Sequence, residues 1–578
     1  MPSKISQKIL CPTTPKKLSK INHLSKINKK SHKITQIKDC SNFAERQNVQ
    51  KSQHLLAAKE SSKFQEKCAV VGVFGAPNAP ILAYYSLFAL QHRGQEASGI
   101  AVSDNSKISL HKQNGLVTRV FTPQILSTLK GCNAIGHNRY STAGEDSINE
   151  CQPIYARYSL GAIAIAHNGN LTNAQSIREN LTKEGAIFQS HLDTEVLIHL
   201  IAKSSKSTLY ERIIESIRQI DGAYALVILS RTKMFAIRDP YGLRPLSLGS
   251  IKNADGTLSY IVASESSAFD LVGAEFIRDI EAGEMLVFER NTKDTISTEK
   301  GTKSSKKSSA KLSTDLDFTT DCSTDFSLAP TYKSYQFATP KSAPCVFEYI
   351  YFARPDSNVF GRNVYTVRKR LGIELAKEHI LSADMVIPVP DSGVAAALGY
   401  AKQSGIDFEL GIIRNHYVGR TFIEPTQSAR ELKVKLKLNP NASIIKGKDI
   451  IVIDDSIVRG TTSKQIVQIL RQSGARKIYL LISSPPTISP CYYGVDTPQT
   501  DQLICANYSI EEVRDFIGAD YLGFLSLDGL AKSVNDDDNT NNSGKNTTNA
   551  NLTSSTKSKA TYCQACFDGK YIDCVHCK

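Results

Sequence analysis

The hydrophobic positions in the second half of the chain form a repeating pattern of short apolar runs and amphipathic stretches. The apolar runs lie at residues 386–389, 410–413, 450–453 and 478–482. Unbroken runs of this length suit strands that are buried on both faces of a parallel sheet, with a helix between consecutive strands. We therefore predict that residues 336–532 form a doubly wound α/β domain, which binds its ligands at the carboxyl ends of the strands.

Residues 68–290 show a different order of elements and are predicted to form a separate α+β domain. Apolar segments predict strands at 70–74, 163–166, 224–229 and 234–238, and helices at 81–91 and 193–202. Strands of this kind need a covered face on each side of the sheet. The pattern therefore fits two sheets with flanking helices.

Four further segments lie outside these domains. Residues 1–67 are rich in Lys, Ser and Gln, residues 291–335 and 533–560 have linker composition, and residues 561–578 are rich in cysteine. The two linker-like segments are predicted to be disordered insertions. No run of about 18 apolar residues occurs, so we predict no membrane span.

The positive charge is concentrated at the amino terminus. Residues 1–67 hold 15 Lys+Arg and 4 Asp+Glu, which gives +11 of the formal net charge of +14. The rest of the chain is near balance, so no nucleic-acid partner is predicted. The extension lacks the apolar core of a secretory signal, and both a transit peptide and a disordered extension stay open. We expect a cytoplasmic location, with a plastid or mitochondrial location as the alternative.

The clearest chemistry lies directly after the apolar run at 450–453. Asp454 and Asp455 follow the run, and a turn with Gly460 leads into a predicted helix. Helix-start N–H groups and the helix dipole favour an anion, and glycine lets the backbone approach a phosphate. Two carboxylates would repel that phosphate unless they bind a sugar hydroxyl or a hard cation such as Mg²⁺. A capped turn with solvated aspartates is the simpler alternative.

The run VIDDSIVRGTTS at residues 452–463 resembles the phosphoribosyl pyrophosphate loop of type I phosphoribosyltransferases, in the form found in the amidophosphoribosyltransferase family. The segments at 348–357, 389–393 and 417–423 resemble the same family. The resemblance implies Mg²⁺ ligands at Ser392, Asp454 and Asp455, and phosphoribosyl pyrophosphate contacts at Asp454, Asp455, Ser456, Gly460, Thr461 and Thr462. It also implies a flexible loop at 414–437, in which Arg420 and Lys435 contact the substrate. A solvated face is the alternative for these two basic residues.

Four polar motifs of the first domain resemble the glutaminase domain of class II, N-terminal-nucleophile glutamine amidotransferases. They are QHRGQE at 91–96, GHNRYST at 136–142, HNGNL at 167–171 and DTE at 193–195. The resemblance implies a four-layer αββα fold and Cys68 as the nucleophile. Its own α-amino group, freed by a cut after Lys67, would serve as the base. The family often has glycine where this chain has Ala69.

The same resemblance assigns roles within the glutamine pocket. Arg139 would pair with the α-carboxylate of glutamine, and Asp193 would accept from its α-ammonium group. Asn168 and the N–H of Gly169 would form the oxyanion hole. Thr142 and Gly94 would line the pocket. His137 and His167 are expected to be structural.

The chain has 13 cysteines, and four of them lie in the last sixteen residues. The two C-x-x-C pairs at Cys563–Cys566 and Cys574–Cys577 are compatible with a zinc site. Resemblance to the iron–sulfur form of the family instead implies a structural [4Fe–4S] cluster. Its implied ligands are Cys345, Cys491, Cys563 and Cys566, and the pair Cys574 and Cys577 falls outside this pattern.

We therefore expect an enzyme that uses glutamine to convert 5-phosphoribosyl 1-pyrophosphate to 5-phosphoribosylamine, the first step of purine synthesis. Ammonia would pass from Cys68 to the sugar through an internal channel. An amidotransferase with another acceptor and a non-catalytic regulator that binds phosphoribosyl pyrophosphate are the alternatives. The resemblance also implies feedback by purine nucleotides and a homotetramer.

Overall fold

A computed structural model describes residues 68–140, 148–290, 329–415, 437–495, 497, 499–535 and 561–572. All of them belong to one compact unit, Glu60–Lys578. The predicted extension 1–67 and most of the two predicted insertions lie outside the described residues. Among the helices in those ranges, none has the length and apolar character needed to cross a membrane.

Two antiparallel sheets form the centre of the first domain. The seven-stranded sheet has the order β11-β9-β10-β1-β4-β2-β3, and the six-stranded sheet has the order β13-β12-β8-β7-β6-β5. The first consists of β1 (Ala69–Phe74), β2 (Ala97–Ser103), β3 (Ile108–Asn114), β4 (Asn133–Arg139), β9 (Ser247–Lys252), β10 (Leu258–Ala263) and β11 (Glu275–Asp279). The second consists of β5 (Ile154–Tyr158), β6 (Gly161–Leu171), β7 (Gly222–Ser230), β8 (Met234–Arg238), β12 (Glu284–Arg290) and β13 (Pro330–Gln336).

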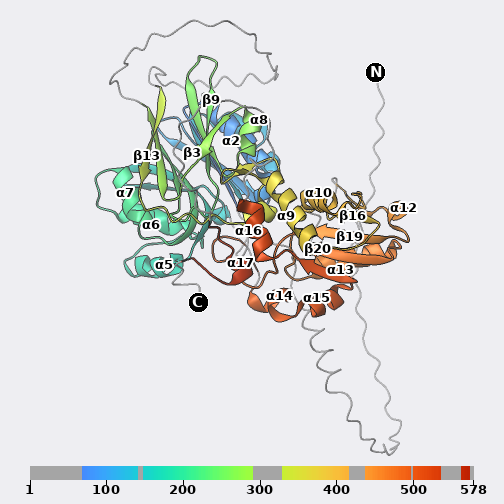
Figure 1. Cartoon of the computed structure of the whole chain (residues 1–578). Helices are drawn as coiled ribbons and strands as arrows, with labels where there is room; N and C mark the ends of the chain where they lie inside the picture. The colour runs from blue at the N-terminus through green and yellow to red at the C-terminus, as the bar shows by residue number, and fades with distance from the viewer. Residues whose placement is uncertain are drawn as a thin grey trace, which may run out of the picture. The chain divides into compact units, whose positions relative to one another are not determined.

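The two sheets pack face to face and are covered by helices on their outer faces (Figure 1). Buried residues such as Val70, Val227 and Phe288 fill the space between the sheets. The helices over the first sheet are α2 (Ala79–Ala89), α3 (Val117–Val120), α4 (Pro123–Thr128) and α8 (Ser267–Val272). Those over the second are α5 (Ala174–Lys183), α6 (Thr194–Lys203) and α7 (Leu209–Ile217). This is the expected αββα arrangement.

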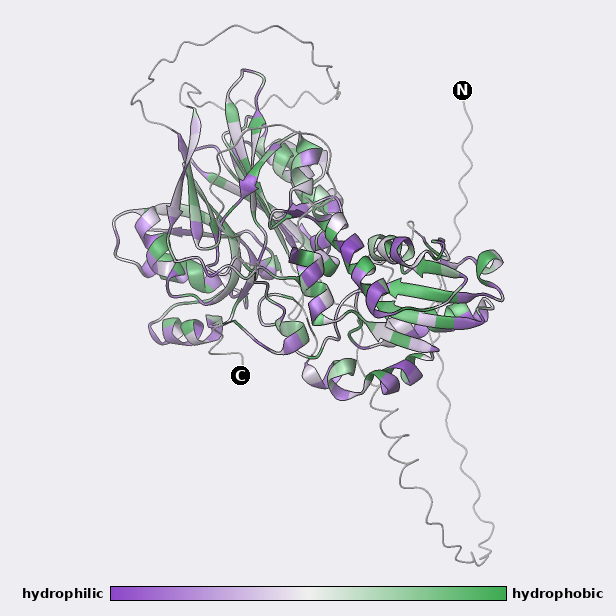
Figure 2. Cartoon of the chain, viewed as in Figure 1, coloured by the Kyte–Doolittle hydropathy of each residue, from purple (hydrophilic) through white to green (hydrophobic). Residues whose placement is uncertain are grey.

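The second domain is built on a parallel sheet of order β16-β19-β20-β21. Its strands are β16 (Met385–Pro388), β19 (Asp449–Asp454), β20 (Lys477–Ile482) and β21 (Tyr521–Phe524). Its helices are α9 (Val364–Glu378), α10 (Val394–Ser404), α12 (Ala442–Ile445), α13 (Thr461–Gln472), α14 (Ile504–Asn507), α15 (Ile510–Ile517) and α16 (Leu527–Asn535). Figure 2 shows apolar strands between helices that carry polar outer faces, as the sequence pattern predicts.

The predicted strand at 410–413 is placed differently by the structure. Residues 412–414 form β17 (Ile412–Arg414), which pairs antiparallel with β18 (Leu438–Pro440) in a separate two-stranded ribbon. The chain runs beside β16 slightly earlier, where Val386 N–H donates to the Asp407 carbonyl at 2.8 Å. Leu410 and Ile413 are about half exposed, so this run is not the buried strand that its composition indicated.

Two predicted boundaries also need correction. The predicted insertion 291–335 extends too far, because β13 begins inside it, at Pro330, and pairs with β12 along its whole length. β13 is an edge strand that starts at Pro330, a position that tolerates proline. The predicted end of the second domain at residue 532 is too early, because α16 continues to Asn535.

Candidate active sites

Cys68 lies at the start of β1, beside the end of β4. Its neighbour Ala69 is the register partner of Asn138, which places Cys68 next to Arg139. The carbonyl oxygen of Cys68 accepts a hydrogen bond from Arg93 Nε at 3.3 Å. A Cβ on Gly94 would stand 2.8 Å from the carbonyl carbon of Arg139. The motif at 91–96 therefore packs directly against Cys68, the predicted nucleophile, and against the strand that carries Arg139.

Asn168 and Gly169 lie on β6, in the second sheet. The Asn168 side chain is fully buried, and within the described residues neither its amide nitrogen nor its amide oxygen has a hydrogen-bond partner. A buried amide without a partner is costly, and such groups are retained where a ligand completes them. Gly169 has φ 150°, and a Cβ there would lie 2.0 Å from the Ala223 carbonyl oxygen. This geometry fits an oxyanion hole whose charge is supplied by the substrate.

Asp193 lies directly before α6, next to the end of β6. Its Oδ2 accepts from the Leu171 N–H at 2.9 Å, and its Oδ1 accepts from the Thr194 hydroxyl at 3.1 Å. Burial raises the pKa of Asp193, but the His167 imidazole and these donors outweigh it and lower the pKa to about 2. Asp193 is therefore an anion at neutral pH, which suits contact with an ammonium group.

His137 and His167 connect the two sheets beneath this site. His137 Nε2 lies 3.0 Å from the carbonyl oxygen of His167, and His167 Nδ1 lies 3.0 Å from the Thr194 hydroxyl. Burial lowers the pKa of His137 to about 3, so that ring is neutral. Arg139 on β4 and Asn168 on β6 are thereby held at the same end of the two sheets. Thr142 lies outside the described residues.

The predicted Mg²⁺ ligands lie at the carboxyl ends of two neighbouring parallel strands. Asp454 ends β19, and Asp455 follows it; both are 1% exposed. The turn after β16 packs closely against the same edge, because a Cβ on Gly393 would lie 2.3 Å from the Ile453 carbonyl oxygen. Ser392, in that turn, is therefore brought to the edge that carries the two aspartates. All three side chains are oxygen donors, which a hard cation requires.

The start of α13 provides the predicted phosphate site. Gly460 precedes this 12-residue helix and has φ 72°, and Thr461 and Thr462 occupy its first positions. The first N–H groups of a helix have no intrahelical partners and point outward. The Ser456 hydroxyl donates to the Asp455 carboxylate, so the turn also links the phosphate and carboxylate parts of the site.

The structure describes the two ends of the predicted flexible loop at 414–437, but residues 416–436 lie outside the described residues. Arg420 and Lys435 lie outside the described residues. The loop's two ends are joined by the β17–β18 ribbon, which Asn415 extends by donating its N–H to the Lys437 carbonyl at 2.9 Å. The ribbon fixes where the loop leaves and rejoins the domain.

The cysteine-rich tail returns to the start of the second domain. Cys563 donates its N–H to the Pro344 carbonyl at 2.9 Å and accepts from the Val346 N–H at 3.1 Å, which places it beside Cys345. Cys566, in α17 (Ala565–Asp568), accepts through its carbonyl from the Ile488 and Ser489 N–H groups. Burial raises the pKa of Cys345 to about 12, and neighbouring Cys491 adds to the effect.

The thiols of Cys345, Cys491, Cys563 and Cys566 are soft sulfur ligands, unlike the oxygen ligands that a hard cation such as Mg²⁺ prefers. In the described part of the chain, no three His, Cys, Asp or Glu side chains converge closely enough to hold a single metal ion. Burial raises the pKa of Cys566, and the nearby thiols of Cys345, Cys491 and Cys563 add to the effect, so the four sulfur atoms are neighbours, which is compatible with a cluster held by cysteines. Cys574 and Cys577, which the zinc alternative would use, lie outside the described residues.

A cluster of buried charges was not anticipated from the sequence. Arg93, Glu265, Arg244 and Glu348 are each 2% exposed or less and form ion pairs with one another. Arg93 lies in the motif QHRGQE and Glu348 in the segment 348–357, but the resemblance assigns a role to neither residue. For Glu348 the available signal was a carboxylate inside an otherwise aromatic and apolar stretch, whereas the polar motif around Arg93 carries no such signal.

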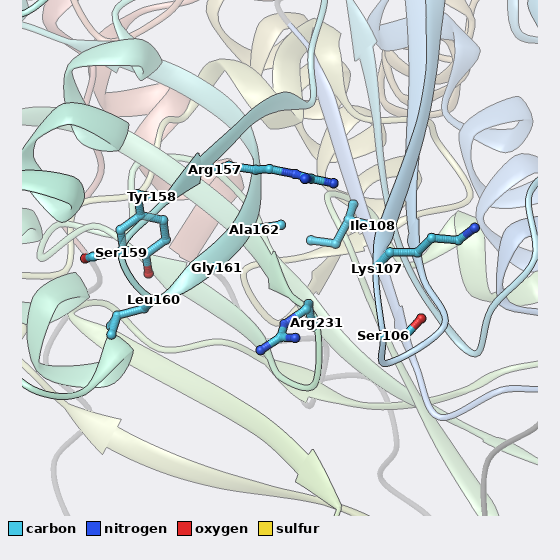
Figure 3. A pocket seen from close by; sticks show the side chains of 10 residues that line it. All are labelled: Ser106, Lys107, Ile108, Arg157, Tyr158, Ser159, Leu160, Gly161, Ala162 and Arg231. Atoms are coloured by element: carbon cyan, nitrogen blue, oxygen red, sulfur yellow. The ribbon is translucent and has the colours of Figure 1, made fainter.

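A surface pocket of about 460 Å³ lies elsewhere, between hairpin turns of the first domain (Figure 3). Arg157 and Arg231 reach toward it, whereas Lys107 points away. None of the residues predicted to bind glutamine or phosphoribosyl pyrophosphate lines this pocket. It is therefore separate from both candidate sites.

Comparison with known proteins gives consistent results. A family described as a glutamine amidotransferase domain matches residues 137–270. An amidophosphoribosyltransferase of Bacillus subtilis is 43% identical over 513 residues, which cover 89% of this chain and 95% of that protein. The chloroplastic amidophosphoribosyltransferase 1 of Arabidopsis thaliana is 42% identical, and the match covers 89% of this chain and 80% of that protein.

A solved structure matches both domains. It is the glutamine phosphoribosylpyrophosphate amidotransferase of B. subtilis in complex with ADP and GMP. The match has a TM-score of 0.72 and 42% identity, and covers 87% of this chain and 97% of that chain.

Proposed function

The chain belongs to the amidophosphoribosyltransferase family, and we propose that it opens de novo purine synthesis. Its reaction converts 5-phosphoribosyl 1-pyrophosphate, glutamine and water to 5-phosphoribosylamine, glutamate and pyrophosphate. The observation that carries this function is the match to the B. subtilis enzyme. The match extends over 95% of that protein and therefore spans both domains of the chain.

Glutamine hydrolysis would take place between the start of β1 and the end of β6. The Cys68 sulfur attacks the amide carbon of glutamine, and the thiol proton passes through the residue's own α-amino group to the leaving ammonia. The Asn168 amide and the Gly169 N–H receive the oxyanion. Water then hydrolyses the thioester and releases glutamate. Arg139 and Asp193 hold the two charged ends of the amino acid.

In this structure Arg139 is near a carboxylate, with its guanidinium 4.0 Å from that of Glu150. At that distance the pair is loose, and the guanidinium keeps donors for a bidentate contact with the substrate carboxylate. Asp193 is already ionised and hydrogen bonded, so it needs no rearrangement to accept from an ammonium group. These features support the glutamine-binding roles.

Ammonia would then attack the anomeric carbon of the sugar as pyrophosphate leaves. The start of α13, with Gly460, Thr461 and Thr462, binds the 5-phosphate. Asp454 and Asp455 orient the ribose hydroxyls, and with Ser392 they would hold Mg²⁺, which neutralises charge on the leaving pyrophosphate. Arg420 and Lys435, on the loop joined by the β17–β18 ribbon, would cover the substrate and exclude water.

The four cysteines Cys345, Cys491, Cys563 and Cys566 would hold a [4Fe–4S] cluster. The tail that carries two of them packs on both domains, since its residues contact Leu243 and Ala223 of the first domain and Phe347 of the second. A cluster there would fasten the end of the chain to the enzyme and would take no part in the chemistry. Four iron atoms and four acid-labile sulfides per chain would support the cluster. Stoichiometric zinc without iron would contradict it.

Two properties concern regulation and assembly. The matched B. subtilis structure is complexed with ADP and GMP, which supports purine nucleotides as inhibitors of this chain. Titration of both nucleotides in the steady-state assay measures this, and unchanged rates at millimolar nucleotide would contradict it. A homotetramer is a prediction from the resemblance, which light scattering of the purified protein measures.

For location, the chloroplastic names of plant relatives support the plastid alternative over the cytoplasmic one. A fluorescent protein fused after residues 1–67 and expressed in plant cells should enter plastids and lose the extension. A fusion that stays in the cytosol would support the cytoplasmic location instead.

The decisive experiment measures products. Purified protein with glutamine and phosphoribosyl pyrophosphate should release glutamate and pyrophosphate in equal amounts. Ribose 5-phosphate and aspartate, offered as other acceptors, should release no amidated product. Binding without pyrophosphate release would favour the regulator hypothesis, and turnover with another acceptor would favour the other amidotransferases.

A further inference from the structure

Glu348 lies in the second domain and is completely buried against the first. Its carboxylate accepts two hydrogen bonds from Arg93, from Nη1 to Oε2 and from Nη2 to Oε1, each at 2.9 Å. This is the parallel two-point geometry that fixes a guanidinium in position as well as in charge. The two residues are separated by 255 positions in the sequence, so the pair joins the two domains.

Arg93 passes this constraint to the nucleophile. Its Nε donates to the Cys68 carbonyl at 3.3 Å, and its Nη1 donates to Glu265 at 2.6 Å. Glu265 also accepts from the Arg354 N–H and from the Ser357 hydroxyl. The guanidinium of Arg93 is thereby held on every side, and the residue that carries the reactive thiol is one of its contacts.

Glu348 also reaches the oxyanion strand by a second route. Its Oε1 accepts from Arg244 Nη1 at 3.2 Å, and Arg244 Nε donates to the Tyr493 carbonyl at 3.2 Å. The loop that contains Tyr493 packs on β6: a Cβ on Gly494 would lie 3.0 Å from the Cα of Gly169.

A further contact joins the same loop to β6. Asn170 Nδ2 donates to the Tyr492 carbonyl at 2.9 Å. One carboxylate therefore stands between the nucleophile on one side and the oxyanion strand on the other. The oxyanion donor must match the position of the attacking thiol to a fraction of an ångström, because poor placement reduces the rate steeply.

We propose that Glu348 is a positioning residue for glutamine hydrolysis, which it serves from the transferase domain by fixing Arg93 against Cys68 and Arg244 against the loop beside Gly169. The inference rests on the proposed function, because it assumes that Cys68 and Gly169 act on glutamine. Glu348 itself touches no substrate. It acts only through the two arginines.

The test is Glu348→Gln, which keeps the size of the side chain and removes its charge. Glutamine-dependent kcat/KM should fall about 10- to 100-fold, while transfer from ammonia stays within about twofold. Labelling of Cys68 by the glutamine analogue 6-diazo-5-oxonorleucine should slow by the same factor as glutamine turnover. Loss confined to the glutamine reaction is a signature that general destabilisation would not produce.

Glu284→Gln is the matched control. Glu284 is buried and makes a two-point pair with Arg278, at 2.7 and 2.6 Å, on β12 away from both sites. It should leave the ratio of glutamine to ammonia activity unchanged. An equal change of that ratio in both variants would overturn the proposal, because the effect would then follow from losing any buried ion pair.

Arg93→Lys provides a second measurement in case Glu348→Gln does not fold. Lysine keeps the charge beside Glu348 and Glu265 but removes the Nε donor to Cys68, so the same selective loss is expected. Glu348→Gln with normal glutamine turnover, or an equal loss with glutamine and ammonia, would overturn the proposal. Failure of the proposed function itself is distinguishable, since the unmodified enzyme would then give no amidated sugar from either nitrogen source.

Discussion

Asn168 offers a substitution whose effects on activity and on stability should separate. Its amide is buried without a hydrogen-bond partner in the described residues, so Asn168→Ala removes no hydrogen bond from the folded protein. Removal of an unpaired buried amide relieves about 1–3 kcal/mol of desolvation cost, which offsets the small cavity that is left. The net change in the free energy of unfolding should therefore stay within about 1 kcal/mol.

The same substitution should strongly affect catalysis. Loss of one oxyanion donor costs about 10²- to 10³-fold in kcat, or about 2.7–4 kcal/mol, in other hydrolases. The assay is glutamate release from glutamine, with ammonia-dependent transfer and thermal unfolding measured on the same preparation. Ammonia-dependent transfer should be retained, because the phosphoribosyl site is untouched.

Asn138→Ala is the matched control. Asn138 is equally buried, but its amide donates to the Leu87 carbonyl at 2.7 Å and accepts from the Ser98 hydroxyl at 3.0 Å. Its loss should cost about 1–3 kcal/mol of stability because two partners are left unpaired. An Asn168→Ala enzyme that loses as much stability as Asn138→Ala, or that hydrolyses glutamine at the normal rate, would contradict the role of Asn168 as an oxyanion donor.

Three further predictions concern the nucleophile, the transferase site and pH. Cys68→Ala should abolish glutamine-dependent activity and keep ammonia-dependent transfer, and the active unmodified enzyme should begin at Cys68 in N-terminal sequencing; a fully active enzyme with an intact Met1 would contradict the cut. Asp455→Asn should lower transfer from both nitrogen sources about 10²-fold, because both need the sugar substrate correctly placed; unequal losses would point to another role. The pKa of Asp193 is lowered to about 2, so its stabilising effect is present above its unfolded pKa of about 3.9 and is lost as pH falls toward 2. Asp193→Asn should therefore flatten the decline of stability over that pH window in acid titrations, and an unchanged slope would argue against it.

The strands of the second domain that were predicted correctly are those that are buried in the parallel sheet, where only apolar side chains fit. The run at 450–453 is buried on both faces in β19, and the run at 478–482 is buried in β20 except for the partly buried Tyr479; burial of this kind requires a continuous apolar sequence. The run at 410–413 looks similar in the sequence but belongs to a half-exposed ribbon. β13 has the opposite character, since its mostly polar residues are held by backbone pairing with β12. Local composition does not distinguish these cases.

The candidate sites could be placed because their residues lie in short motifs, such as the one around Asn168 or the one around Asp454. The structure adds the unpaired state of the Asn168 amide and the approach of Gly393 to β19. The pairing of Arg93 with Glu348 could not be predicted, because nothing in either motif specifies a partner 255 residues away. Contacts between domains depend on packing of whole elements, which a single sequence does not encode locally.

The place of β1 within its sheet bears on how a processed enzyme would start. β1 is hydrogen bonded to β10 on one side and to β4 on the other. The first residues of most proteins fray because few contacts hold them. A cut after Lys67 would leave a chain whose second residue already belongs to a doubly paired strand. The new α-amino group would then be held in place by the paired strand, as the backbone of an internal residue is. It would still be a free amine that can accept a proton.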